Sequence, residues 1–513
     1  MELSTLSWIL YGVIIFTTFI ITILYFYMTR NFKYWKKRGV KEISPTPFVG
    51  SFGKYFKHEK SPGALFKYFY DQNQDLPYVG IYILDKPCLL IRDPELLKLI
   101  LIKDFNYFSD KFMHSSKKDI ISNNSLFFIE NPYWKYVRQK FTALFTTGKM
   151  KSMFDNVREV GNDLDNYLDT LELEGSGKSV NITELAGKFT TDLIGQATYG
   201  LKLNSLKNPN AEFRKFGRAM FGTYNFKRAV ELATVWLAPD YTTLFGFRFF
   251  LKSAANFFRT AFQDILDERK KSKLNRNDFI DLMIQLRDNE NNNLNSNLFK
   301  FQGDNLLAQA LTLFAAGYDT SSSTMSFALF ELAKNQEMQL KLRAEINEAI
   351  KKNNGQITYE ITSDLEYLDM FISEILRMYP TLPFVDRKTT KNYKIEKTGL
   401  VIEKGTPILI PMLGFHYDPK YFPNPHNFNP ERFSSDRKSS INPYVYLPFG
   451  IGPRNCIGMR QGLLQTKLGI IFIISRFEMS LLENTCIKFD KLSVLSSSKG
   501  GIFLNVRKLD EKN

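Results

Sequence analysis

The segment PFGIGPRNCIGMRQG, Pro448 to Gly462, places Cys456 in a loop with four glycines and an arginine two residues before it. A thiolate can attack a substrate as a nucleophile or bind a soft metal. Nucleophilic use needs a nearby base, usually histidine, and the chain has only four histidines. Zinc needs several ligands, and the sequence has no CxxC or CxH cluster. A single thiolate instead suits haem, which brings its other ligands with it.

The residues around Cys456 fit a flat, acidic cofactor. Glycines let backbone amides approach the sulfur and a planar ring lie close by, and Arg454 is placed to pair with a haem propionate. Phe449, Gly452, Arg454, Cys456 and Gly458 match F-x-x-G-x-R-x-C-x-G, so the loop resembles the haem-binding signature of cytochrome P450. The resemblance implies that Cys456 binds the haem iron and that Phe449 and Arg454 contact the haem. The alternative is a glycine-rich loop around a structural cysteine.

Two further signatures stand upstream in the order of that family. Glu374 and Arg377, in SEILRMYP, match E-x-x-R and share one helical face. With Arg432 of NPERF they resemble the family's buried Glu-Arg-Arg cluster, which is structural. The alternative, a surface ion pair, is the default interpretation of an isolated E-x-x-R.

AAGYDTSSS, starting at Ala315, matches the family's A-G-x-[DE]-T motif on a long central helix. Glycine, threonine and serine are poor choices for a plain buried helix, but they suit a helix that opens a pocket for a small ligand. The resemblance assigns proton delivery to Thr320 and Asp319. The alternative is a Gly/Thr/Ser kink in a core helix.

Other candidate site residues come from the same resemblance. Trp134 and Arg138 match W-x-x-x-R, whose side chains meet a haem propionate, and their spacing puts them on one helical face; a surface stack is the alternative. Arg387 is a further predicted propionate partner. The loop from Asp110 to Asn124 and four small or apolar residues are predicted to line the substrate pocket: Thr312, Ala315, Ala316 and Leu382.

The N-terminus predicts a membrane anchor. From Leu3 to Thr29 no side chain is charged, and about 20 residues span the hydrocarbon layer. Arg30, Lys33, Lys36, Lys37 and Arg38 follow, and the positive-inside rule places them in the cytosol. The alternative is a cleaved signal. We expect an anchor over residues 1–29, a basic, proline-containing linker over 30–53 and a haem mono-oxygenase domain over 54–513.

Composition narrows the class of protein. The chain has 513 residues, 44% of them hydrophobic, which is enough for a large core. Three cysteines are too few for a disulfide framework. The net charge is 68 − 53 = +15, but the cations are spread along the chain, so we expect no nucleic-acid partner. A solvated basic surface, membrane lipid and an acidic protein partner remain as explanations of the charge.

Periodicity predicts a mainly helical domain with minor sheet (α+β). The resemblance implies the cytochrome P450 fold, preceded by one transmembrane helix. Polar DNENNNLNSN (288–297) is predicted to be an exposed loop. We expect short strands over 77–84, 87–93, 405–412 and 501–508, and long helices over 180–199, 304–335 and 338–352.

The resemblance covers nearly the whole chain and is closest to microsomal insect P450s of the detoxification family 6. It implies a haem b mono-oxygenase of the EC 1.14 type, single-pass in the endoplasmic reticulum membrane with a cytosolic catalytic domain. Its substrate would be a small lipophilic xenobiotic or endogenous compound. Electrons would come from NADPH through cytochrome P450 reductase, with cytochrome b5 as a second candidate donor. The alternatives are a P450-fold isomerase or dehydratase and a haem-binding sensor or carrier.

Two surface hypotheses follow from the same layout. Aromatic segments between Phe213 and Phe250, with Trp236 and Phe245, either dip into lipid or are core residues. Six cations are predicted to border the face behind Cys456 and to attract an acidic flavoprotein: Lys135, Lys140, Arg437, Lys438, Arg460 and Lys467.

Overall fold

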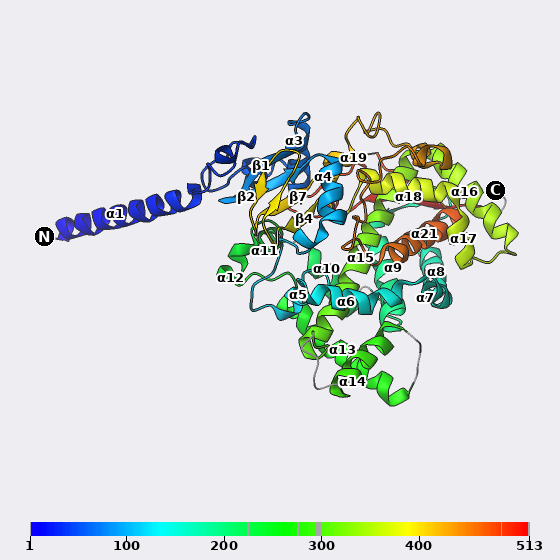
Figure 1. Cartoon of the computed structure of the whole chain (residues 1–513). Coiled ribbons are helices and arrows are strands. Elements are labelled where there is room, and N and C mark those ends of the chain that lie inside the picture. Colours follow the sequence, from blue (N-terminus) through cyan, green and yellow to red (C-terminus); the bar gives the residue numbers. More distant parts are fainter. Residues whose placement is uncertain are drawn as a thin grey trace.

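The computed structural model describes residues 2–510 except 209, 223–224, 274–275, 277, 293–298 and 484. A long helix, α1, projects from a mainly helical body (Figure 1). Helices of the first half are α1 (Glu2–Thr29), α2 (Gly53–Phe56), α3 (Pro62–Asp71), α4 (Pro94–Lys98), α5 (Ile120–Asn123), α6 (Tyr133–Thr142), α7 (Thr147–Ser152), α8 (Phe154–Asp169), α9 (Ile182–Ile194), α10 (Glu212–Phe221), α11 (Phe226–Leu237), α12 (Thr242–Phe245) and α13 (Lys252–Ser272).

The second half continues the helical body. Its helices are α14 (Phe279–Asn292), α15 (Gly303–Lys334), α16 (Gln336–Lys352), α17 (Tyr359–Asp364), α18 (Glu366–Met378), α19 (Met412–His416), α20 (Ser435–Lys438) and α21 (Met459–Arg476). Short 3-10 or π turns are η1 (Lys36–Arg38), η2 (Leu99–Lys103), η3 (Phe105–Tyr107), η4 (Ala143–Phe145), η5 (Gly195–Tyr199), η6 (Pro239–Tyr241) and η7 (Pro430–Phe433).

The sheets lie to the sides of the helical body. A four-stranded sheet has the order β1 (Tyr78–Ile83), β2 (Lys86–Ile91), β7 (Pro407–Ile410) and β4 (Val385–Lys388). In it, β2 and β7 are parallel, and the other pairs are antiparallel. A three-stranded antiparallel sheet has the order β3 (Lys178–Asn181), β9 (Phe503–Lys508) and β8 (Phe477–Leu481), and β5 (Tyr393–Lys394) pairs with β6 (Val401–Ile402).

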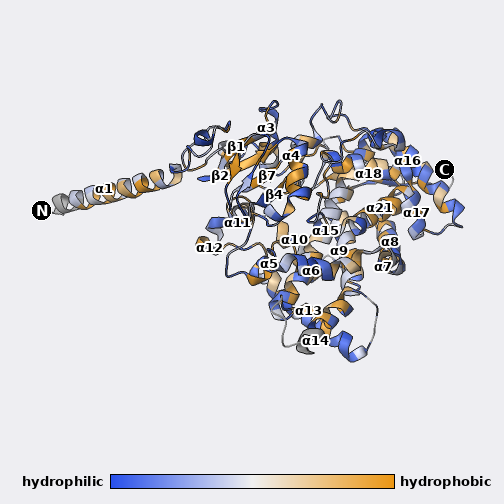
Figure 2. Cartoon of the chain, viewed as in Figure 1, coloured by the Kyte–Doolittle hydropathy of each residue, from blue (hydrophilic) through white to orange (hydrophobic). Residues whose placement is uncertain are grey.

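Helix α15 is the central element of the core. It contacts α9, α10, α13, α18, α21 and strand β8, and most of its C-terminal half is buried. Hydrophobic residues concentrate on the four-stranded sheet and on the inner helices around α15 (Figure 2). Residues that serve the candidate site are therefore held by a long buried rod and its neighbours.

Local sequence explains where several helices begin. Ser61 accepts a hydrogen bond from the N–H of Ala64 at the start of α3, and Pro62 occupies the first helical position. Asn181 accepts from the N–H of Glu184 at the start of α9. Such capping satisfies N–H groups that have no partner inside the helix.

The predicted fold class is confirmed, and so are the predicted elements, with small shifts of their ends. The strands correspond to β1, β2, β7 and β9, and the helices to α9 with η5, α15 and α16. Residues 180 and 181 belong to strand β3 rather than to the helix. The predicted loop over 288–297 is wrong at its start, because α14 continues to Asn292; residues 293–297 lie outside the described residues.

The N-terminal segment has two parts. Within the described residues, Ser7–Thr29 is a candidate membrane span with mean hydropathy 2.3, and its most apolar stretch is not buried. The segment predicted as a linker instead packs on the domain: Trp35 and Phe52 are buried in the core, and Glu42 and Gly50 form bridges to β1. The boundary at residue 54 stays a prediction.

Candidate active site

The cysteine loop connects the segment after α20 to the start of α21. The N–H of Cys456 donates to the carbonyl of Phe449 (2.8 Å), and the N–H of Gly450 donates to the carbonyl of Leu447 (2.9 Å). At Gly452 (φ +76°) a Cβ atom would lie 1.9 Å from the carbonyl oxygen of Leu101, so only glycine fits there. The side chain of Cys456 is exposed, so this compact loop leaves the thiol accessible.

Arg138 joins helix α6 to this loop. Its guanidinium donates to the carbonyl and to the side-chain oxygen of Asn455, each at 2.8 Å. The surrounding protein raises the pKa of the Cys456 thiol, whereas the N–H of Gly458 and the Arg138 guanidinium pull that pKa down. Arg138 therefore both anchors the residue before the thiol and favours its thiolate form.

The other three predicted propionate partners lie together beside the loop. The Arg454 guanidinium lies 4.5 Å from the ring centroid of buried Trp134 and donates to the carbonyl of Ile129 (2.7 Å). Arg387 of β4 is buried nearby, and repulsion from its charge lowers the pKa of Arg454. The structure thus brings together Trp134, Arg387 and Arg454 from three separate segments.

Sequence reasoning missed a third cation at this place, Lys111. Its Nζ lies 3.3 Å from the ring centroid of Phe127 and 4.0 Å from a carboxylate oxygen of Asp386. Burial, together with repulsion from Arg387 and Arg454, lowers the pKa of Lys111 to about 7. Its place directly after Asp110, the start of the predicted pocket loop, was the available signal.

This cationic group fits a buried dianion. Burial lowers the pKa of Arg454 to about 9 and that of Arg387 to about 10. The Nε atoms of both arginines are buried and have no hydrogen-bond partner among the described residues. Buried cations need compensating charge, so the residues present fit the two propionates of haem, with Cys456 as the thiolate donor.

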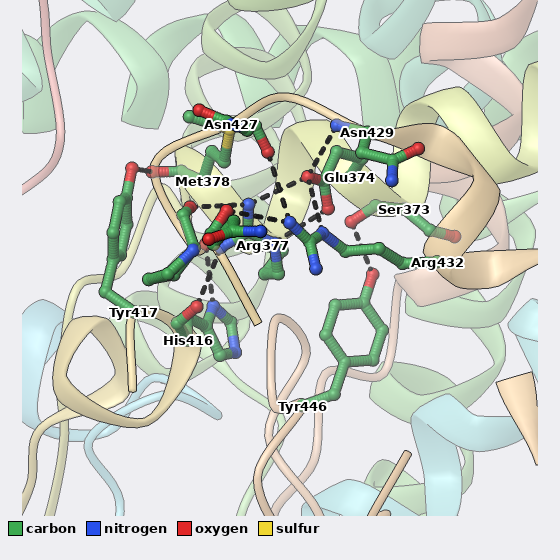
Figure 3. A network of polar contacts seen from close by, with 12 residues as sticks. Ser373, Glu374, Arg377, Met378, His416, Tyr417, Asn427, Asn429, Arg432 and Tyr446 are labelled. Carbon is green, nitrogen blue, oxygen red and sulfur yellow. Dashed lines mark hydrogen bonds and ion pairs between the residues drawn. The ribbon is translucent and has the colours of Figure 1, made fainter. Parts of the chain in front are cut away.

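The predicted Glu-Arg-Arg cluster forms at the end of α18 (Figure 3). Arg377 donates from Nε and Nη2 to the two carboxylate oxygens of Glu374 at 2.7 and 2.8 Å, and both side chains are fully buried. Arg432 lies 3.4 Å from Glu374 and donates to backbone carbonyls of the loop before η7. The cluster ties α18 to the segment that leads into the cysteine loop.

The A-G-x-[DE]-T motif lies in the middle of α15. The hydroxyl of Thr320 donates to the carbonyl of Ala316 (2.7 Å). Burial raises the pKa of Asp319 to about 6, while Arg214 pulls it down. The motif suggested that Gly317 opens a pocket, but it does not. A Cβ at this position would lie 2.5 Å from Cδ1 of Ile194, so this glycine lets α9 approach α15.

The four predicted substrate residues differ in exposure. Ala316 is exposed and Thr312 is partly exposed, with its hydroxyl bonded to the carbonyl of Ala308 (2.7 Å). Leu382 is half-buried against the core. Ala315 is only 2% exposed and faces the core, because one residue step turns a helix by about 100°. Ala316 and Thr312 therefore lie on the accessible face of α15, and Ala315 does not.

A polar cavity of about 890 Å³ reaches Asp319 from the side of α9 and α10. Arg214 of α10 donates to the hydroxyl of Tyr318 (2.7 Å) and to the carboxylate of Glu184 (2.8 Å) in the wall of this cavity. Sequence reasoning missed this cluster, because Tyr318 occupies the variable position of A-G-x-[DE]-T and no motif includes Arg214 or Glu184. The three side chains place polar groups in the wall of the cavity that Asp319 borders.

Comparisons with known proteins agree with this geometry. A family profile described as Cytochrome P450 matches residues 41–505. The chain belongs to the cytochrome P450 family. It is 38% identical to cytochrome P450 6k1 of Blattella germanica over 95% of both chains. It is 36% identical to cytochrome P450 6l1 of the same insect over 90% of both chains.

The same similarity extends to cytochrome P450 6a2 of Drosophila melanogaster, with 36% identity over 94% of this chain and 96% of that one. The predicted family, its insect family-6 character and the P450 mono-oxygenase activity are thereby confirmed. Haem and iron binding come with the family. The roles of the individual site residues stay predictions.

The two surface hypotheses hold for some of their residues and not for others. Among the six predicted docking cations, the prediction for Lys467 is wrong. Its side chain is buried, lies 2.5 Å from Asp369 and donates to the carbonyl of Thr362. The other five are exposed. Of the aromatic residues, Trp236 is a core residue, whereas Phe245 is 60% exposed.

Proposed function

We propose that this P450 holds haem b through Cys456 and oxidises a small lipophilic substrate with electrons delivered from NADPH by cytochrome P450 reductase. The observation that carries the proposal is the group of buried cations beside the cysteine loop, Lys111, Arg387 and Arg454, whose charge suits two propionates. Trp134 and Arg138 complete the predicted set of contacts. When bound, haem iron supplies the activation of dioxygen.

The protein's own residues handle protons and water. Asp319, with a pKa near 6, can exchange a proton with water in the polar cavity near neutral pH. The neighbouring hydroxyl of Thr320 is placed to pass this proton to the face of α15 that carries Ala316. We assign Asp319 and Thr320 to proton delivery, and Phe449 to the wall beside the haem.

The substrate pocket is assigned to Thr312, Ala316, Leu382 and the loop from Asp110 to Asn124. These residues are small or apolar at α15, which suits a lipophilic substrate of xenobiotic or endogenous origin. The decisive experiment measures NADPH consumption, oxygen uptake and product with purified reductase across lipophilic compounds that perturb the haem spectrum on binding. Oxygen uptake with product supports the proposal; spectral binding without either would contradict it.

The electron donor is assigned to the face behind Cys456. Lys135 and Lys140 project from α6, whose Arg138 is bonded to the cysteine loop, and Arg460 at the start of α21 donates to the hydroxyl of Thr147 (3.1 Å). Arg437 is exposed on α20. A cationic surface here would raise the encounter rate with an acidic flavoprotein; cytochrome b5 is a second candidate.

Charge reversal tests this assignment. Changing Lys135, Lys140 and Arg437 to glutamate should slow haem reduction by the reductase, most at low ionic strength, since the Debye length falls to about 8 Å at physiological salt. Turnover driven by added peroxide should be unchanged. Reversing the exposed Lys271, Lys273 and Lys351, at the C-terminal ends of α13 and α16, is the matched control. Equal losses in both assays would show that the first set supports the fold.

We further propose that α1 anchors the protein in the endoplasmic reticulum membrane with the catalytic domain in the cytosol. The hydroxyl of Tyr241, the last residue of η6 directly before α12, bonds Asp85 (2.7 Å) and contacts Met28 at the base of α1 (3.8 Å). The exposed Leu244 and Phe245 of α12 therefore lie on the side from which α1 extends (Figure 1). A glycan added to a site engineered after Arg30 would contradict the orientation.

A further inference from the structure

His416 lies between the Glu374–Arg377 ion pair and the cysteine loop. It is the last residue of α19 and is fully buried. Its ring is stacked on Tyr446, with centroids 5.6 Å apart, and faces the edge of Phe422. Figure 3 shows the ring directed toward the carbonyl end of α18. No sequence motif used above includes this histidine.

Both ring nitrogens of His416 are engaged with backbone. Nδ1 lies 3.0 Å from the carbonyl oxygen of Arg377, and Nε2 lies 3.0 Å from the backbone nitrogen of Leu447. A carbonyl can only accept and an N–H can only donate. The ring is therefore neutral, with its proton on Nδ1 and a lone pair on Nε2. In return Arg377 donates from Nη1 to the carbonyl of His416 (2.8 Å).

Leu447 is the residue at which the cysteine loop begins to turn. Its carbonyl accepts from the N–H of Gly450, and the carbonyl of Phe449 accepts from the N–H of Cys456. A series of hydrogen bonds, joined by the backbone of the loop between them, thus runs from the buried ion pair through His416 and Leu447 to the ligand residue. Between the carbonyl of Arg377 and Cys456, every donor and acceptor is backbone except the imidazole, so His416 is the one side chain in that part of the series that transmits position.

We propose that His416 is a positioning residue for the thiolate ligand, acting through the bond from Leu447 N–H to its Nε2. This inference rests on the proposed binding of haem by Cys456. Burial is consistent with the neutral ring, since burial, with repulsion from Arg377, lowers the pKa of His416 to about 3. The charged and titratable groups around it are Arg377 and Glu374 of α18 and the phenol of Tyr446.

Two amide substitutions separate the two bonds of the ring. In His416→Gln the side-chain amide reaches the place of Nε2 and can accept from Leu447, whereas in His416→Asn it reaches only the place of Nδ1 and can donate to Arg377. Each is measured as the holoprotein for haem content, thermal midpoint and the reduced-CO band of haem–thiolate proteins per bound haem. His426→Leu is the control, because His426 is exposed in the same segment.

We expect His416→Gln to keep most of the band per bound haem and His416→Asn to lose at least half of it, with His426→Leu unchanged. Equal band intensity in the Gln and Asn variants at equal haem content would overturn the proposal, whether both keep the band or both lose it. A wild-type protein that binds haem without the band would instead overturn the assignment of Cys456 on which the proposal rests.

Discussion

The two sides of the candidate active site are built in opposite ways. On the cysteine side, Glu374, Arg377 and His416 are fully buried and bonded to one another or to backbone. On the α15 side, Ala316 is exposed and Asp319 borders a polar cavity. A metal ligand has to stay in one place, so its supports are rigid and dry. Proton delivery needs water and groups that exchange partners, so that side stays open and polar.

The strongest test of the rigid side removes the ligand itself. Cys456→Ser should abolish the reduced-CO band, because a serine hydroxyl does not replace the thiolate as a strong donor to iron. Cys486→Ser and Cys88→Ser should keep the band, since Cys486 is exposed and Cys88 is buried in β2. An intact band in Cys456→Ser would refute the assignment.

The second test breaks the support instead of the ligand. Glu374→Ala leaves the buried guanidinium of Arg377 without its carboxylate, and we expect a loss of about 3–5 kcal/mol in the free energy of unfolding. Glu431→Ala removes the exposed ion pair with Lys341 and should cost about 0–1 kcal/mol. Urea denaturation of both variants measures the difference. Similar losses in Glu374→Ala and Glu431→Ala would mean that burial gives the cluster no more stability than an exposed ion pair has.

On the α15 side the expected effect is on chemistry rather than on stability. Thr320→Ala removes a hydroxyl whose partner in the helix is the carbonyl of Ala316, so folding and haem content should survive. Proton delivery should fail part of the time, giving several-fold less product per NADPH and more hydrogen peroxide. Thr324→Ala, one turn further along α15, is the control. Unchanged coupling in Thr320→Ala would assign the proton to another group.

The smallest expected effect concerns the pH dependence of stability. Burial raises the pKa of Asp319 from 3.8 to about 6, so its stabilising contribution is complete below pH 3.8 and is lost as the pH rises through 6. Above pH 6 the wild type therefore holds a buried charged carboxylate, which costs stability, whereas Asp319→Asn has no charge to bury. We therefore expect the variant to melt above the wild type at neutral pH, with a difference that shrinks as the pH falls below 6, while product formation drops. A constant difference across this range would contradict the shift.

Local patterns predicted much of this protein. E-x-x-R encodes a contact that depends on a short spacing within one helix, and the structure forms the Glu374–Arg377 pair at the expected position. Helix α1 was equally predictable, because an uncharged run of that length has few other structures.

Contacts between distant segments were decided by the tertiary structure. Lys111, Arg214 and His416 reach the site from separate elements and belong to no motif. Lys467 appeared to be a surface cation but is buried against Asp369, and Ala315 faces the core while Ala316 does not. The physical reason is that charge and residue type state what a side chain can do, whereas the packing of α15 against its neighbours decides which side chains meet, which lose water and which remain open.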